Sequence, residues 1–158
     1  MITTTVTTVQ KLVEKYGRER SALLPILQEL VRLEGYLTKD AMIEVAKELD
    51  LSATEVYGVA SFYSFLDIVP RGRYKIRVCK SITCSHRNRL VLEELEKILK
   101  IKVGGTTLDG RFSLLMTNCI GQCDHSPAML INDNVYTDLT PEKVREIIHK
   151  YIHNQVEN

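Results

Sequence analysis

The sequence predicts an all-helical domain followed by an α/β domain with a small mixed sheet. Two observations lead to this prediction. Apolar residues recur at the helical period of about 3.6 up to residue 70, and the period changes to about 2 after the Val-Pro-Arg-Gly segment at residues 69–72. We therefore place a helical domain at residues 1–70 and an α/β domain at residues 71–158.

Four helices are expected in the first part, with caps or glycines at their ends. The second helix begins at Ser21 and ends at Gly35. Thr38 is a candidate N-cap of the third helix, and Ser52 and Glu55 form a capping box (S-x-x-E) at the start of the fourth. The apolar residues at helical spacing in this bundle are Leu12, Val13, Tyr16, Leu23, Leu24, Leu27, Leu30, Val31, Met42, Val45, Ala46, Leu49, Val56, Val59, Ala60 and Tyr63.

The second part begins with a strand that leads directly to a cysteine. Residues 73–78 alternate polar and apolar side chains, which predicts a half-buried strand running into Cys79. Apolar spacing over residues 91–99 predicts a helix, and alternation over residues 112–116 predicts a second strand that leads to Cys119.

A hairpin and a final helix complete the domain. The segment Asn-Asp-Asn at residues 132–134 predicts a tight turn between two short strands. Thr140 followed by Pro141 is a typical helix start, because proline is tolerated at the first helical position. The expected order is therefore β-α-β-β-β-α, which is typical of a small α/β layer.

Composition and charge exclude several classes of protein. The chain has 158 residues, of which 44% are hydrophobic and 26% charged, so it is neither disordered nor fibrous. The net charge of +1 gives no general reason to expect nucleic-acid binding. The start of the chain does not resemble a signal peptide, and no apolar run approaches the roughly 20 residues that cross a bilayer. We expect a cytoplasmic protein without a membrane span.

The four cysteines form two pairs, Cys79 with Cys84 (C-x4-C) and Cys119 with Cys123 (C-x3-C). We expect each pair in a loop just past a strand end, so that one edge of the sheet can present both. Clustered, reduced thiols in a cytosolic protein are more often metal ligands or redox groups than disulfides.

The spacing of the pairs favours an iron–sulfur cluster without excluding other uses. Structural zinc and thioredoxin-type dithiols usually need C-x2-C, which is absent, whereas a [2Fe–2S] cluster tolerates longer spacings. Ser81, Thr83 and Ser85 could donate hydrogen bonds near the first pair, and Gly121 would let the backbone approach the second. Zinc binding, a disulfide and plain buried thiols remain alternatives.

Positive charge surrounds the first cysteine pair. Seven Lys or Arg residues and no acidic residue lie between Arg71 and Arg89. They could stabilise the reduced form of an anionic cluster. Alternatively, Arg73, Lys75 and Arg77 form the solvated face of a strand that must avoid edge-to-edge pairing, or a docking patch for an acidic partner.

The four histidines also have alternative interpretations. His86 and His125 each follow a cysteine by two residues and could replace a thiolate ligand, as in Rieske centres, although four cysteines make this unnecessary. His149 and His153 lie four residues apart on the last predicted helix. Such a pair can bind a metal, and it also suits the negative end of a helix dipole.

Five segments carry a resemblance to a known family. They are E-V-Y-G-V-A-S-F-Y-S-F (55–65), V-C-K-S-I-T-C (78–84), G-G-T-T-L-D-G-R-F (104–112), C-I-G-Q-C (119–123) and P-A-M-L-I-N (127–132). Together they resemble the thioredoxin-like [2Fe–2S] ferredoxin family over nearly the whole chain. The family includes the small iron–sulfur subunit of respiratory complex I and the gamma or C subunits of NAD-linked, often electron-bifurcating, hydrogenases and formate dehydrogenases.

The resemblance implies a thioredoxin-like fold from about residue 73 onward. It implies a [2Fe–2S] cluster with Cys79 and Cys84 on one iron and Cys119 and Cys123 on the other. It also implies a larger partner subunit that carries FMN, an NADH site and its own iron–sulfur cluster. The helical domain would then dock that partner, with residues 56–65 as a candidate surface, although helical spacing also suits part of this segment to core packing.

We therefore expect an electron-relay subunit of an NAD-linked oxidoreductase complex, with no turnover of its own, because no other catalytic motif is present. Gln122 and Asp124 in the second cysteine loop favour a hydrogenase-type complex. The corresponding subunit of respiratory NADH:quinone oxidoreductase is the alternative. A zinc-stabilised adaptor and a free-standing thiol redox sensor are alternatives from other classes of protein.

Overall fold

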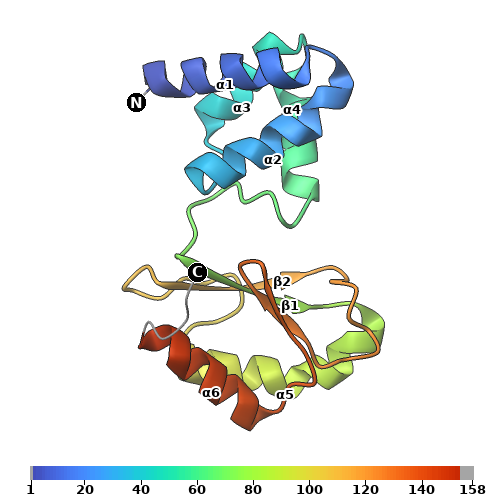
Figure 1. The fold of residues 1–158 in the computed structure, drawn as a ribbon, viewed down its shortest axis with the longest axis vertical. Coiled ribbons are helices and arrows are strands. Elements are labelled where there is room, and N and C mark those ends of the chain that lie inside the picture. The colour runs from blue at the N-terminus through green and yellow to red at the C-terminus, as the bar shows by residue number, and fades with distance from the viewer. Residues whose placement is uncertain (1, 154–158) are drawn as a thin grey trace. The chain divides into compact units, whose positions relative to one another are not determined.

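The computed structural model describes residues 2–153 and shows two compact units, each with its own hydrophobic core. The first unit is Met1–Pro70 and the second is Arg71–Asn158. The first is entirely helical, and the second combines a sheet with two helices (Figure 1).

The first unit contains four α-helices and a short 3-10 helix. They are α1 (Ile2–Tyr16), the 3-10 helix (Arg20–Ala22), α2 (Leu23–Glu34), α3 (Lys39–Glu48) and α4 (Ala53–Phe62). The predicted caps are confirmed, because the side chains of Thr38 and Ser52 accept hydrogen bonds from the backbone N–H groups of Ala41 and Glu55, each at 3.1 Å. Gly35 ends α2 in the left-handed conformation, with φ of 84°.

The core of the helical unit follows the predicted apolar spacing except at Tyr16, whose side chain is 36% exposed, and at Tyr63. The fully buried residues include Ile26, Leu27, Leu30, Val45 and Val56. Tyr63 was expected to face inward, but its side chain is 44% exposed. It follows the last residue of α4 in an extended conformation, so the helical spacing no longer determines its direction.

The second unit has the predicted order β-α-β-β-β-α. Its elements are β1 (Tyr74–Cys79), α5 (Ile82–Leu99), β2 (Phe112–Thr117), β3 (Met129–Ile131), β4 (Asn134–Tyr136) and α6 (Pro141–Ile152). The strand order is β2-β1-β3-β4, with β1 and β2 parallel and the other neighbours antiparallel. This is the small mixed sheet that the sequence predicts.

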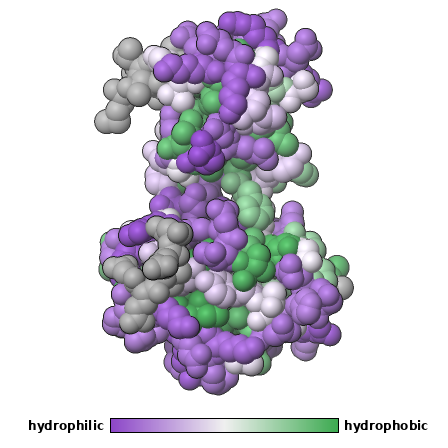
Figure 2. All heavy atoms as spheres, viewed as in Figure 1, coloured by the Kyte–Doolittle hydropathy of each residue, from purple (hydrophilic) through white to green (hydrophobic). Residues whose placement is uncertain are grey.

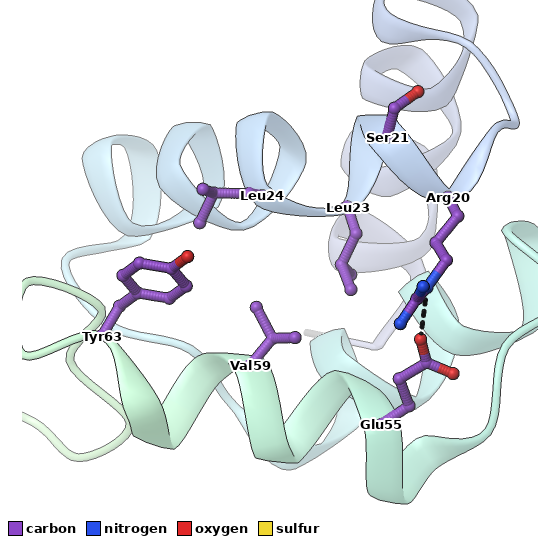
Figure 3. Close-up of a pocket in the computed structure, with 7 residues that line it drawn as sticks. All are labelled: Arg20, Ser21, Leu23, Leu24, Glu55, Val59 and Tyr63. Atoms are coloured by element: carbon purple, nitrogen blue, oxygen red, sulfur yellow. Dashed lines mark hydrogen bonds and ion pairs between the residues drawn. The ribbon is translucent and has the colours of Figure 1, made fainter.

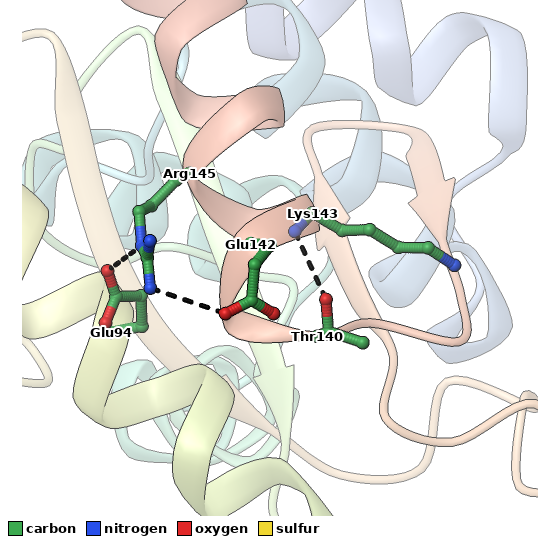
Figure 4. Close-up of polar contacts among 5 residues, drawn as sticks. All are labelled: Glu94, Thr140, Glu142, Lys143 and Arg145. Carbon is green, nitrogen blue, oxygen red and sulfur yellow. Dashed lines mark hydrogen bonds and ion pairs between the residues drawn. The ribbon is translucent and has the colours of Figure 1, made fainter.

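Helices α5 and α6 lie together against one face of the sheet (Figure 1). Across their exposed surface, Arg145 of α6 pairs with Glu94 of α5 at 2.6 Å, and it also approaches Glu142 (Figure 4). Thr140 caps α6 by accepting a hydrogen bond from the N–H of Lys143, as predicted. The core between helices and sheet includes Tyr74, Ile76, Val78, Val91, Leu95, Leu114, Met129, Ile131, Val144 and Ile148.

Strand β1 is a central strand, and this corrects one expectation. Because β2 and β3 pair with it on both sides, β1 needs no protection against edge-to-edge association. Arg73 is exposed and Lys75 is half-buried, but Arg77 is only 4% exposed. The three residues therefore do not form a uniformly solvated face.

The visible surface of both units is mostly hydrophilic, with separate apolar patches (Figure 2). Within residues 2–153, no helix has both the length and the apolar character required to cross a membrane.

Candidate metal centre

The pairing of β1 with β2 brings the two cysteine pairs to one edge of the sheet. Cys79 is the last residue of β1 and lies opposite Thr117, the last residue of β2. The N–H of Lys80 continues this pairing by donating to the carbonyl of Thr117 at 2.8 Å. Cys119 follows Thr117 by two residues, and because parallel strands end at the same edge, both cysteine segments emerge there.

Cys84 does not lie in a loop, as the sequence suggested, but in the first turn of α5. Its N–H donates to the carbonyl of Ser81 at 2.9 Å, which starts the helix. Cys79 likewise lies within a strand rather than past its end. The first turn of a helix carries free N–H groups and the positive end of the helix dipole, and both favour a thiolate.

Asn88, which the sequence analysis did not identify, holds the surroundings of the first pair together. Its side chain is 3% exposed and donates to the carbonyl of Cys79 at 2.9 Å. Its amide oxygen accepts a hydrogen bond from the N–H of Ala128 at 3.2 Å. Asn88 therefore links the end of β1, helix α5 and the segment that leads to β3.

The second pair lies in the loop that follows β2. The sulfurs of Cys119 and Cys123 are 3.4 Å apart, and the N–H of Gly121 donates to the Cys119 sulfur at 3.4 Å. Gly121 has a φ of 78°, which favours glycine, so its predicted role in bringing the backbone close to sulfur is confirmed. The side chains of Thr83 and Ser85, expected as further donors, lie outside the described residues.

The sulfur atoms of Cys119 and Cys84 disfavour the negative charge of a thiolate at Cys123. Contact with Cys119, together with the nearby Cys84, raises the pKa of the Cys123 thiol to about 11. A thiol in this position gives up its proton readily only when a cation offsets the neighbouring negative charge. A metal bound to these sulfurs would offset the repulsion between neighbouring thiolates.

The donor set fits a metal with sulfur ligands. All four cysteines are free thiols, with Cys79 and Cys84 buried and Cys119 and Cys123 exposed. Two sulfurs on one tetrahedral metal at about 2.3 Å would lie about 3.8 Å apart, close to the observed separation in the second pair. Among the described side chains no three ligands are already arranged around one point, so the sulfurs would converge fully only on binding.

The nearby histidines do not resemble ligands of this centre. The two ring nitrogens of His125 lie 3.4 Å and 3.5 Å from carboxylate oxygens of Asp124 and Asp138. His86 is exposed on α5. Arg77, in contrast, precedes Cys79 by two residues on β1, so its side chain leaves the sheet on the same face.

A small mixed sheet with two helices on one face and four reduced cysteines at one edge defines an α/β protein with a candidate thiolate metal site. The family model for the thioredoxin-like [2Fe-2S] ferredoxin matches residues 9–152. The chain belongs to the thioredoxin-like [2Fe-2S] ferredoxin family, and the resemblance found in the sequence is thereby confirmed.

Two relatives at the level of sequence are subunits of an NADH-quinone oxidoreductase. A subunit of the NADH-quinone oxidoreductase of Escherichia coli (strain K12) is 40% identical over 138 residues, which are 86% of this chain and 82% of that protein. The subunit of the same name from Salmonella typhimurium (strain LT2) is 39% identical over 137 residues, with the same coverage.

Two solved structures with a similar fold come from another enzyme. The air-oxidised NAD+-reducing [NiFe]-hydrogenase matches 87% of this chain with a TM-score of 0.63 and 27% identity. The H2-reduced form matches 83% with a TM-score of 0.67 and the same identity. The chain spans 23% of the length of that hydrogenase chain.

Proposed function

We propose that this protein is an electron-relay subunit of an NAD-linked flavin and iron–sulfur oxidoreductase, in which Cys79, Cys84, Cys119 and Cys123 hold one [2Fe–2S] cluster. The observation that carries the proposal is the parallel pairing of β1 with β2, which brings both cysteine pairs to one sheet edge in a member of this family. When bound, the cluster accepts and releases one electron at a time.

The residues of the centre have different tasks in this proposal. Buried Cys79 and Cys84 provide the side that is shielded from water, while exposed Cys119 and Cys123 provide the side at the surface. The N–H of Gly121 donates to a ligand sulfur, and such hydrogen bonds favour the more negative, reduced state. The nearly buried positive charge of Arg77 acts in the same direction.

The comparisons favour the respiratory complex over the hydrogenase-type complex that Gln122 and Asp124 suggested. The relatives from NADH-quinone oxidoreductase share 39–40% identity over more than four-fifths of both chains. We therefore propose membership of a complex similar to NADH-quinone oxidoreductase. A hydrogenase-type complex is the second candidate, and the structural similarity to the NAD+-reducing [NiFe]-hydrogenase supports it.

A larger flavin subunit that carries FMN and the NADH site is the partner we propose, docked on the helical unit. Within the segment 56–65, Val56 and Ala60 are buried in the core, while Tyr57, Phe62 and Tyr63 are exposed, as is the neighbouring Phe65. Phe62 is 77% exposed and stacks edge-on with Tyr63. Aromatic side chains with this exposure are typical of protein interfaces.

A pocket beside these aromatic residues could receive an apolar side chain of the partner. It has a volume of about 390 Å³, and Tyr63, Leu24 and Val59 form its apolar part (Figure 3). At its other end, Arg20 and Glu55 form an ion pair of 2.7 Å. An apolar recess with a polar margin of this kind suits a single anchoring side chain.

Purification of the native assembly through a tag on this chain tests the proposal. Under anaerobic conditions we expect a larger subunit that binds flavin and oxidises NADH, together with quinone-reducing subunits. Nickel–iron hydrogenase subunits in their place would select the second candidate. An assembly without any flavin subunit would contradict the proposal.

A further inference from the structure

The C-terminal end of α6 carries two exposed histidines, His149 within the helix and His153 at its C-cap, that take no part in the cysteine centre. His149 and His153 lie four residues apart, and the N–H of His153 donates to the carbonyl of His149 at 3.1 Å. This backbone bond sets the two side chains one helical turn apart, on the same side of the helix.

The two imidazole rings point the same type of nitrogen toward each other. The Nε2 atoms are 3.1 Å apart, and the ring centroids are 4.1 Å apart. Two imidazole nitrogens bound to one metal at about 2.1 Å lie about 3.0 Å apart at a right angle and about 3.4 Å apart in a tetrahedron. The observed separation lies within this range, so the two nitrogens are close enough to bind one ion.

The turn that presents the histidines is anchored on both sides. Tyr151, between them, is buried in the core, and its hydroxyl group contacts that of Tyr136 at 2.8 Å. The guanidinium of Arg111 donates to the carbonyls of Tyr151 and Ile152 at 2.8 Å and 2.9 Å. Because these contacts hold the end of α6, binding a metal there would order little additional backbone.

We propose that His149 and His153 form a bidentate site for a divalent transition metal of the zinc, nickel or copper type, with water in the remaining positions. Imidazole nitrogen suits these metals, whereas magnesium and calcium prefer oxygen ligands. No third His, Cys, Asp or Glu among the described residues joins the pair, which is why water completes the coordination. A plain hydrogen bond between the two rings is the competing explanation.

Calorimetric titration of the cluster-loaded full chain with Ni²⁺ under anaerobic conditions tests the site. We expect one Ni²⁺ per chain, and an affinity at least tenfold weaker in both His149→Gln and His153→Gln. The matched control is His86→Gln, which removes an exposed histidine from α5 and should bind Ni²⁺ like the unmodified chain. Unchanged affinity in either His149→Gln or His153→Gln would overturn the proposal, because a bidentate site needs both rings.

Thermal unfolding gives a second, independent readout. Ni²⁺ that binds only the folded chain raises the unfolding temperature, and the rise grows with the logarithm of the Ni²⁺ concentration above the dissociation constant. The rise should occur in the unmodified chain and in His86→Gln and be absent when both His149 and His153 are replaced. An equal rise in the double variant would place the nickel elsewhere. Because both side chains are exposed, the variants should fold normally.

Discussion

At the level of single residues, two nearly buried polar side chains lie near Cys79 and could support the proposed centre. The amide of Asn88 donates to the Cys79 carbonyl and accepts from the Ala128 N–H. Without these hydrogen bonds, each buried backbone group left unpaired would cost about 1–3 kcal/mol. Arg77 has a permanent positive charge, and its side chain extends from the same face of β1 as the side chain of Cys79. In our proposal, Asn88 therefore fixes the backbone around Cys79, and Arg77 places a positive charge close to it.

Replacing Arg77 with Met should lower the reduction potential of the bound cluster. The substitution keeps an unbranched side chain but removes a charge that stabilises the more negative reduced state, so we expect a fall of the order of tens of millivolts. Arg73→Gln is the control, because Arg73 is exposed and its charge is screened by water. A redox titration followed by visible absorption measures both variants, and equal potentials would show that the charge of Arg77 does not act on the centre.

Replacing Cys119 with Ser should damage the cluster and destabilise the second unit. Ligand binding energy is partly folding energy, so loss of one ligand lowers the unfolding temperature of the unit that carries it. The helical unit has a separate core and should keep its stability. Iron analysis and calorimetric unfolding measure the two effects, with the neighbouring exposed Asn118→Ser as control. Normal iron content and stability in Cys119→Ser would contradict a role for Cys119 as ligand.

At the level of elements, the sequence predicted helix starts well where a side chain caps its own helix. The hydroxyl groups of Thr38, Ser52 and Thr140 all accept a hydrogen bond from a backbone N–H three residues later. These contacts are local, and a short stretch of sequence therefore contains all the information. The tight turn predicted at residues 132–134 is local in the same way; the observed turn is one residue shorter, because β3 ends at Ile131 and β4 begins at Asn134.

Apolar spacing does not predict the start of α5, because the first residues on the buried face of this helix are polar or cysteine. The buried positions 84, 88, 91, 95 and 99 follow the helical period, but the first two are Cys84 and Asn88. The apolar spacing therefore predicts only the second half of α5, from Val91 onward. Counting cysteine and asparagine as inward-facing would have extended the helix and moved Cys84 out of the expected loop.

The position of β1 within the sheet could not be predicted from its own residues. Alternating polar and apolar side chains are compatible with an edge strand and with a central strand that has one polar face. Only the pairing with β2 and β3, which are distant in sequence, makes β1 a central strand. The same pairing unites the two cysteine pairs, so the spacing of the cysteines could suggest a shared site but could not establish it.

Two glycines give opposite predictions for stability. A Cβ on Gly72 would lie 2.8–2.9 Å from backbone atoms of Arg111 and Phe112, which cannot move aside cheaply. Gly72→Ala should therefore lower the free energy of unfolding by about 2 kcal/mol or more. Gly58 lies within α4 with open space around it, so Gly58→Ala should raise stability by about 0.5–1 kcal/mol. Chemical denaturation measures both, and a stable Gly72→Ala would show that this close approach is not rigid.

At the level of the whole molecule, we propose that the helical unit binds the partner subunit and that the second unit transfers electrons. Each has its own core, and the cysteines belong only to the second. The exposed aromatic side chains Tyr57, Phe62, Tyr63 and Phe65 belong only to the first. Substitutions on the helical unit should therefore affect association with the partner without changing the metal centre.

A double substitution, Tyr57→Ser with Phe62→Ser, should weaken association with the flavin subunit. Both side chains are largely exposed, so the fold should tolerate their loss, whereas interface aromatics typically contribute about 1 kcal/mol or more each, or about tenfold in affinity per 1.4 kcal/mol. Leu33→Ser is the matched control, because Leu33 is also exposed and apolar but lies on α2. Co-purification yield, normalised to the iron content of this chain, measures the effect. Equal yields from the double variant and the control would exclude this surface.

Metal and sulfide analysis of the anaerobically purified chain, combined with electron paramagnetic resonance, tests the central proposal most directly. We predict two irons and two inorganic sulfides per chain, a red-brown colour, and a paramagnetic signal that appears after reduction by one electron. Colourless protein that contains one zinc per chain would show that the thiols at this sheet edge serve a structural metal, and no electron could pass through them.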